Sequence, residues 1–142
     1  MRLVVDSNIV FAALLRDGVA RSLLVEPPFE LLCPEWMLVE IRSHREEIAR
    51  RGRLMPEELD ALLSLVSERL EIVRADEYAA TMKDAELRIR NRDAGDIPFL
   101  ALALSHRCDG IWTHNTKHFA ECGVDLWTTA KVLDWVRTHS KA

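Results

Sequence analysis

The sequence is poor in cysteine, and its cysteines form no disulfide framework or metal-binding pattern. Cys33, Cys108 and Cys122 are odd in number, show no CxxC spacing and stand beside apolar neighbours. Such residues are typical of the core of a reduced, cytoplasmic protein, not of a small secreted disulfide scaffold.

A long hydrophobic run is also absent, as is a strong excess of charge of one sign. The longest apolar run, Ile97 to Leu104, is far too short to cross a bilayer, and Arg2 leads into a predicted strand rather than a signal peptide. We therefore expect no membrane association. The formal net charge of −4 argues against a protein held on nucleic acid mainly by bulk charge. A nucleic-acid enzyme remains compatible with this charge, because a few local bases can meet the substrate phosphates.

No repeat, linker or low-complexity tract divides the chain. With 142 residues, 49% of them apolar and 30% charged, the composition is ordinary for a globular protein, and we expect residues 1–142 to form one domain. Strands and helices are predicted to alternate, which indicates an α/β protein with a parallel sheet and helices on both faces. The predicted strands are 3–5, 29–33, 71–73, 110–113 and 124–127, and the predicted helices are 9–15, 20–25, 34–51, 56–70, 76–92, 97–104 and 129–139.

An acid follows directly after the first predicted strand. Leu3, Val4 and Val5 predict a short buried strand, Asp6 ends it, and an apolar helical run begins at once. Open α/β sheets bind ligands at the carboxyl ends of their strands. Asp6 therefore either caps the following helix or contributes to a binding site, and the neighbouring Ser7 and Asn8 are rival caps.

Three other acids and one amide could share that site. Glu40 stands at the edge of the apolar stripe of a predicted helix, where it faces either solvent or the site. Asp93 and Asp96 precede the buried helix at 97–104; Asp96 either caps this helix or lies with Asp93 on one side of a site. Asn115 follows a later strand and is either a turn residue or a polar group placed like Asp6.

In a doubly wound sheet all these positions can face one crevice. Carboxylates that meet there repel one another strongly unless a cation neutralises them. Ligation by oxygen atoms, with water molecules retained, is what Mg²⁺ or Mn²⁺ prefers. The pattern therefore predicts a site for one of these ions.

The ordered set of residues resembles the PIN-domain nucleases, in particular their small prokaryotic members, which include VapC-like toxins. The resemblance covers nearly the whole chain and implies a three-layer α/β/α sandwich with a central, mainly parallel sheet. It also implies metal-dependent cleavage of single-stranded RNA by a metal-activated water. The residues that carry it are Val4-Val5-Asp6-Ser7-Asn8, Glu40, Asp93-x-x-Asp96-x-Pro-Phe-Leu-Ala-Leu-Ala-Leu and Ile111-Trp112-Thr113-His114-Asn115.

This resemblance implies roles for the individual acids. Asp6, Glu40 and Asp96 take the three core positions, where they bind the metal and are catalytic. Asp93 is an additional catalytic acid of the same group. If the chain is the toxin of a toxin–antitoxin pair, its partners include an antitoxin protein as well as RNA.

Asn8 and Thr113 resemble the polar residues that support such a site. The chain departs from the pattern at Asn115, where many relatives carry a fourth acid. An amide can orient a metal-bound water but adds no charge, so the binding of a second metal is open. The family often pairs through its helices, so we expect a homodimer with a contact from the helices at 20–25 and 34–51.

Bases lie on both sides of the acids in the sequence and could hold RNA phosphates. A solvated helix face explains the arginines equally well. The bases are Arg88, Arg90 and Arg92 before Asp93, and Arg107, His114, Lys117 and His118 after the acids. A zinc site at His44, His106 or His114 is disfavoured, because no paired cysteines and no HExxH spacing accompany them.

Two other functions are compatible with parts of the pattern. A binding module with weak or no catalysis is favoured by the amide at Asn115. A phosphatase with an aspartyl nucleophile after the first strand would use Asp-x-Asp, with the second acid protonating the leaving group. Asn8 occupies that second position, which disfavours the phosphatase.

Overall fold

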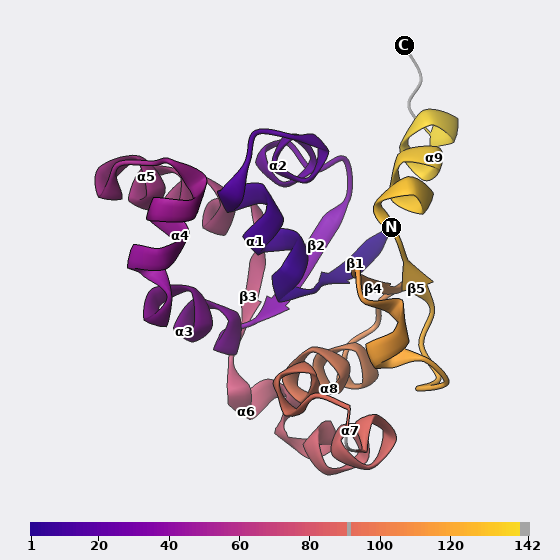
Figure 1. The fold of residues 1–142 in the computed structure, drawn as a ribbon. Coiled ribbons are helices and arrows are strands. Elements are labelled where there is room, and N and C mark those ends of the chain that lie inside the picture. The colour runs from indigo at the N-terminus through magenta and orange to yellow at the C-terminus, as the bar shows by residue number, and fades with distance from the viewer. Residues whose placement is uncertain (91, 140–142) are drawn as a thin grey trace.

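The computed structural model describes residues 1–90 and 92–139, and a five-stranded parallel sheet runs through its centre (Figure 1). The strand order is β3-β2-β1-β4-β5, so the first strand lies in the middle. The strands are β1 (Arg2–Val5), β2 (Glu30–Pro34), β3 (Glu71–Val73), β4 (Gly110–Trp112) and β5 (Leu126–Trp127).

Helices cover both faces of this sheet. The chain moves outward from β1 to β3 on one side and returns to build β4 and β5 on the other. Because parallel crossovers are right-handed, this reversal places α1 to α5 on one face and α6 to α8 on the opposite face (Figure 1). The helices are α1 (Ser7–Leu15), α2 (Val19–Val25), α3 (Trp36–Ser43), α4 (Arg45–Gly52), α5 (Pro56–Arg69), α6 (Ala75–Tyr78), α7 (Met82–Ile89), α8 (Ile97–Ser105) and α9 (Thr129–His139). Short 3₁₀ turns are η1 (Ala79–Thr81), η2 (Ala94–Asp96) and η3 (Thr116–Phe119).

The central strands are buried on both faces, which explains why they are continuous apolar runs and not alternating ones. Leu3, Val4 and Val5 of β1 are fully buried, and α8 packs directly against β1, β2 and β4. The α/β/α arrangement predicted from the sequence is confirmed. Among the helices that the structure describes, none combines the length and the apolar character needed to cross a bilayer.

The predicted single helix over 34–51 is wrong. Pro34 is the last residue of β2, and the helical segment that follows is divided into α3 and α4 at His44. The Ser43 hydroxyl and the His44 ring both bond to the carbonyl oxygen of Glu40, at 2.8 and 2.9 Å. Side chains that bond a nearby carbonyl compete with the helical backbone ladder, and here they end α3.

The predicted helix over 76–92 is also divided. It begins at Ala75 as α6, tightens into η1 and continues as α7, which ends at Ile89; position 91 lies outside the described residues. The Thr81 hydroxyl donates to the carbonyl oxygen of Ala101 at 2.6 Å. This bond ties the kinked region to α8 and fixes the break.

The reversal of the chain creates a crevice at the carboxyl ends of β1 and β4. These two strands pair directly, with Val5 opposite Trp112, although 107 residues separate Asp6 and Thr113, which follow them. In open α/β sheets ligands bind where neighbouring strands lead in opposite directions. Asp6 and Thr113 therefore stand at the position in the fold best suited to a site.

We predict that Gly110→Ala lowers the free energy of unfolding by about 3 kcal/mol. Gly110 begins β4 with a φ of +143°, and a Cβ atom there would collide with the carbonyl oxygen of Asp125. Urea unfolding measures the loss. Gly18→Ala is the control, because the nearest atoms to its added Cβ lie 3.4 Å away on a flexible arginine; it should cost less than about 1 kcal/mol. Equal losses in both variants would contradict the prediction.

Candidate active site

Asp6 is held at the end of β1 by two hydrogen bonds, one to each oxygen. Its Oδ1 accepts from the backbone N–H of Ser7 at 2.8 Å, and its Oδ2 accepts from the hydroxyl of Thr113 at 2.7 Å. The side chain therefore caps α1 and also points into the crevice, so the two predicted alternatives coexist. Only 2% of the residue is exposed, and this burial raises the pKa of its carboxyl despite both hydrogen bonds.

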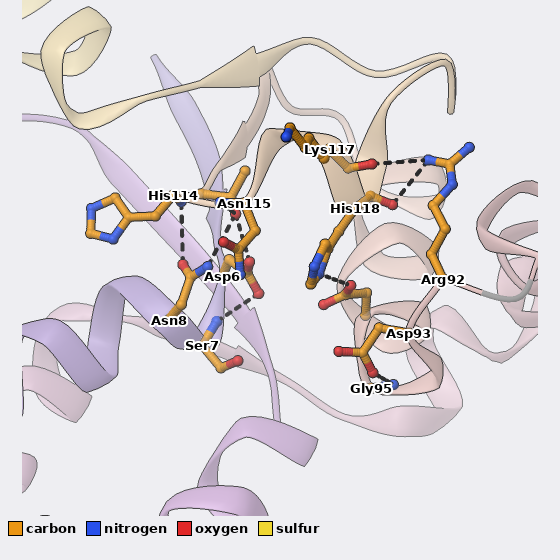
Figure 2. Close-up of polar contacts among 12 residues, drawn as sticks. Asp6, Ser7, Asn8, Arg92, Asp93, Gly95, His114, Asn115, Lys117 and His118 are labelled. Atoms are coloured by element: carbon orange, nitrogen blue, oxygen red, sulfur yellow. Dashed lines mark hydrogen bonds and ion pairs between the residues drawn. The ribbon is translucent and has the colours of Figure 1, made fainter.

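Thr113 is the centre of a polar network around Asp6, and Figure 2 shows Asp6, Asn8 and Asn115 drawn together there. The Thr113 hydroxyl oxygen accepts hydrogen bonds from the backbone N–H of Asn115 at 2.9 Å and from Asn8 Nδ2 at 3.5 Å. The same hydroxyl donates its own hydrogen bond to Asp6 Oδ2. Asn8 Oδ1 in turn accepts from the backbone N–H of His114 at 3.3 Å. The three residues predicted to support the site thus join the start of α1 to the loop after β4.

Asp93 and Asp96 approach the crevice from the turn before α8. Asp93 Oδ1 accepts from the backbone N–H of Gly95 at 2.9 Å, which closes the η2 turn. Asp96 precedes α8, but within the part of the chain that the structure describes its side chain makes no capping hydrogen bond. The predicted role of Asp96 as a helix cap is therefore wrong, and its buried carboxylate is directed elsewhere.

Asp96 instead pairs with His118, for which the sequence predicts only phosphate binding. His118 Nδ1 lies 2.7 Å from Asp96 Oδ2. Burial first, then the charges of Asp6 and Asp93, raise the pKa of Asp96 to about 6, and His118 opposes that rise. One ligand atom each of Asp93, Asp96 and His118 lies within 4.8 Å of the other two. The only sequence signal for His118 was its place shortly after the strand that ends at the crevice.

Glu40 completes the group from α3. Its Oε1 is buried and has no hydrogen-bond partner among the described residues. Burial, followed by repulsion from Asp6, Asp93 and Asp96, raises the pKa of Glu40 to about 7. The solvent-facing alternative for Glu40 is therefore wrong: its carboxylate shares an electrostatic environment with the three other acids.

Among the bases predicted to hold RNA, Arg88 and Arg92 have structural partners. Arg88 bonds both carboxylate oxygens of Asp84 and donates to the carbonyl oxygen of Cys122 at 2.7 Å. Arg92 Nη1 donates to the carbonyl oxygens of Lys117 and His118, at 3.4 and 3.1 Å (Figure 2). It also donates to the carbonyl oxygen of Ala120 at 2.7 Å. Both arginines thus stabilise the loop that carries His118 through hydrogen bonds to its carbonyl oxygens. Arg90 and Lys117, by contrast, are exposed.

The acids fit a divalent cation. The acids lie near enough to one another for repulsion from Asp6 and Asp93 to add to burial in raising the pKa of Glu40 and Asp96. An unpartnered buried oxygen such as Glu40 Oε1 is costly unless a ligand satisfies it. Asp6 keeps acceptor capacity beyond its two hydrogen bonds, because a carboxylate offers about four lone-pair positions.

Comparison with known families supports this interpretation. A family model described as the PIN domain matches residues 4–135. The chain belongs to the PIN-domain family. The resemblance inferred from the sequence is thereby confirmed, and PIN domains are generally metal-dependent nucleases. A search of curated proteins finds no match.

We predict that this PIN domain loses stability as the pH rises when divalent ions are chelated. A carboxyl whose pKa is higher in the folded state binds protons more tightly there. For Glu40, stability therefore falls between its ordinary pKa of 4.5 and about 7, and is level above that. Glu40→Gln removes the ionisable carboxyl and should raise the free energy of unfolding at pH 8 by about 1–3 kcal/mol relative to the wild type, with little change at pH 4.

Chemical unfolding with EDTA at both pH values tests this prediction. Glu46→Gln is the matched control, because Glu46 is exposed in the first turn of α4. A Glu40→Gln variant that gains no more at pH 8 than the control would show that Glu40 is solvated.

We predict that Arg92→Met lowers the free energy of unfolding by about 1–3 kcal/mol, because three carbonyl oxygens of the loop after β4 lose their donor. Arg90→Met is the control, since Arg90 is exposed nearby. Guanidinium unfolding compares the two. If Arg92→Met is as stable as the wild type but no longer binds RNA, Arg92 binds RNA and does not stabilise the loop.

Proposed function

We propose that this PIN domain is a metal-dependent endoribonuclease that cleaves single-stranded RNA. One observation carries the proposal: Glu40 lies near enough to Asp6, Asp93 and Asp96 to be repelled by all three, and among the described residues its buried Oε1 has no hydrogen-bond partner. Such a set of oxygen ligands suits Mg²⁺ or Mn²⁺.

In the mechanism that we propose, Asp6, Glu40 and Asp96 hold the ion. The chemistry that Mg²⁺ or Mn²⁺ supplies is activation of water for attack on phosphorus and stabilisation of the developing charge. Thr113 fixes the orientation of the Asp6 carboxylate through its 2.7 Å hydrogen bond. Asn115, whose backbone is tied to the same hydroxyl, is placed to orient substrate or water with its amide.

A pocket on the Glu40 side of the site supports single-stranded RNA as the substrate. It has a volume of about 500 Å³, and Asn8, Phe11, Glu40, His44 and Arg51 are among the residues that line it. Single-stranded nucleic acids offer unstacked bases that pack on aromatic side chains. We expect an RNA base to pack on Phe11 or His44 and a phosphate to lie near Arg51, in the pocket that Glu40 also lines.

We further propose a toxin role, with an antitoxin as partner and a homodimer as the assembly. Support for a dimer comes from α3, where Trp36 and Val39 are 42% and 51% exposed. Burial of such side chains against a second copy is favourable. The α3 helix also carries Glu40, so a dimer formed there would bring two sites close together.

A binding module without catalysis is the second candidate, and Asn115 is the observation that favours it, because its amide provides no negative charge for a second ion. Such a module could use the same pocket and bases to bind RNA. It would not need the four clustered carboxylates, whose repulsion lowers its stability.

We predict that Asp6→Asn and Asp96→Asn each reduce cleavage of a labelled single-stranded RNA in Mn²⁺ by about 100-fold or more, because each removes a charged ligand of the ion. The wild type should yield products with 5′-phosphate and 3′-hydroxyl ends, and none in EDTA. Glu46→Gln, prepared in parallel, controls for contaminating ribonucleases. Equal residual activity in all preparations, or wild-type RNA binding with no cleavage, would favour the binding module.

A further inference from the structure

We propose that His118 is a nitrogen ligand of the metal in this site, so that the site selects a first-row transition-metal ion such as Mn²⁺ or Co²⁺ over Mg²⁺. The inference rests on the proposed function, since it concerns the same ion. It adds a residue and a metal preference that the four carboxylates alone do not imply.

The geometry supports direct ligation. His118 Nδ1 and Asp96 Oδ2 are 2.7 Å apart, and an oxygen of Asp93 lies within 4.8 Å of a ligand atom on each. Two ligands at adjacent corners of an octahedron with bonds of about 2.1 Å lie about 3 Å apart. The pair can therefore accept an ion between them with a shift of a few tenths of an ångström.

The imidazole is held in place by its loop. Arg92 donates to the His118 carbonyl oxygen at 3.1 Å and to two neighbouring carbonyls, and the adjacent Phe119 is fully buried. Figure 2 shows the His118 ring directed toward the acids from this fastened loop. A ring fixed in this way loses little conformational freedom when it binds an ion, which favours ligation.

An ion pair between His118 and Asp96 does not by itself neutralise the negative charge of the site. Four carboxylates, from Asp6, Glu40, Asp93 and Asp96, are opposed only in part, by His118 beside Asp96 and by His44 near Glu40. Among the described residues Glu40 Oε1 has no hydrogen-bond partner. The remaining negative charge requires a cation. Within the described part of the chain, His118 is the nitrogen ligand that clusters with Asp93 and Asp96.

Nitrogen ligation changes which ion is preferred. Mg²⁺ is a hard ion that takes oxygen ligands, whereas imidazole suits the later first-row metals, whose affinities rise from Mn²⁺ through Co²⁺. With His118 in the set, the site should bind Co²⁺ and Mn²⁺ more tightly than Mg²⁺. An oxygen ligand at position 118 should reduce this difference.

The test uses the full chain, freed of metal with EDTA and then dialysed. Pulsed EPR of bound Mn²⁺ should show hyperfine modulation from a coordinated imidazole nitrogen in the wild type, and none in His118→Asp. Calorimetric titration with Mg²⁺, Mn²⁺ and Co²⁺ should show that His118→Asp lowers the ratio of Co²⁺ to Mg²⁺ affinity about tenfold or more. His114→Asn is the matched control, because the His114 ring bonds Thr129, and it should change neither result.

The outcomes separate this inference from the proposed function. Bound Mn²⁺ without imidazole modulation in the wild type overturns His118 as a ligand, whereas metal-dependent cleavage in the same sample would leave the proposed function intact. The spectrum of the wild type decides this point even if His118→Asp does not fold. A wild-type protein that binds none of the three ions and cleaves no RNA overturns both.

Discussion

The hydrogen bond from Thr113 to Asp6 joins the two strands between which the chain reverses direction. One partner follows β1 and the other follows β4, and the bond is buried at 2.7 Å. Because β1 and β4 lead to opposite edges of the sheet, loops cannot cover their carboxyl ends as tightly as they cover the other strands. The site depends on this opening, and Thr113 keeps the nearest acid aimed into it.

The acids around that opening show a conflict between stability and function. Burial raises the pKa of Asp6, Glu40 and Asp96, so the folded protein resists charging them. Such groups persist where a ligand needs them, since a core of the same shape without charges would be more stable. The hydrophobic layers on both faces of β1 supply the stability that offsets this repulsion.

The layered fold and the position of Asp6 could be predicted from the sequence, because apolar runs and the acid that ends the first one are local signals. The breaks in the helices could not. The division at His44 depends on side chains that bond the Glu40 carbonyl, and α7 is separated from α6 by a bond from Thr81 to a distant helix. The contact between His118 and Asp96 could not be predicted either, since 22 residues separate them and they meet only once the loop after β4 has packed.

The site is assembled from segments that lie far apart in the chain. Asp6 belongs to the first strand, whereas His118 and the Thr113 hydroxyl are supplied only after α8 and β4 have been added. Contacts of such long sequence separation form late, because the entropy of closing the intervening chain must first be overcome. During synthesis on the ribosome the nascent chain therefore cannot assemble the crevice at the carboxyl ends of β1 and β4 until its last third has emerged.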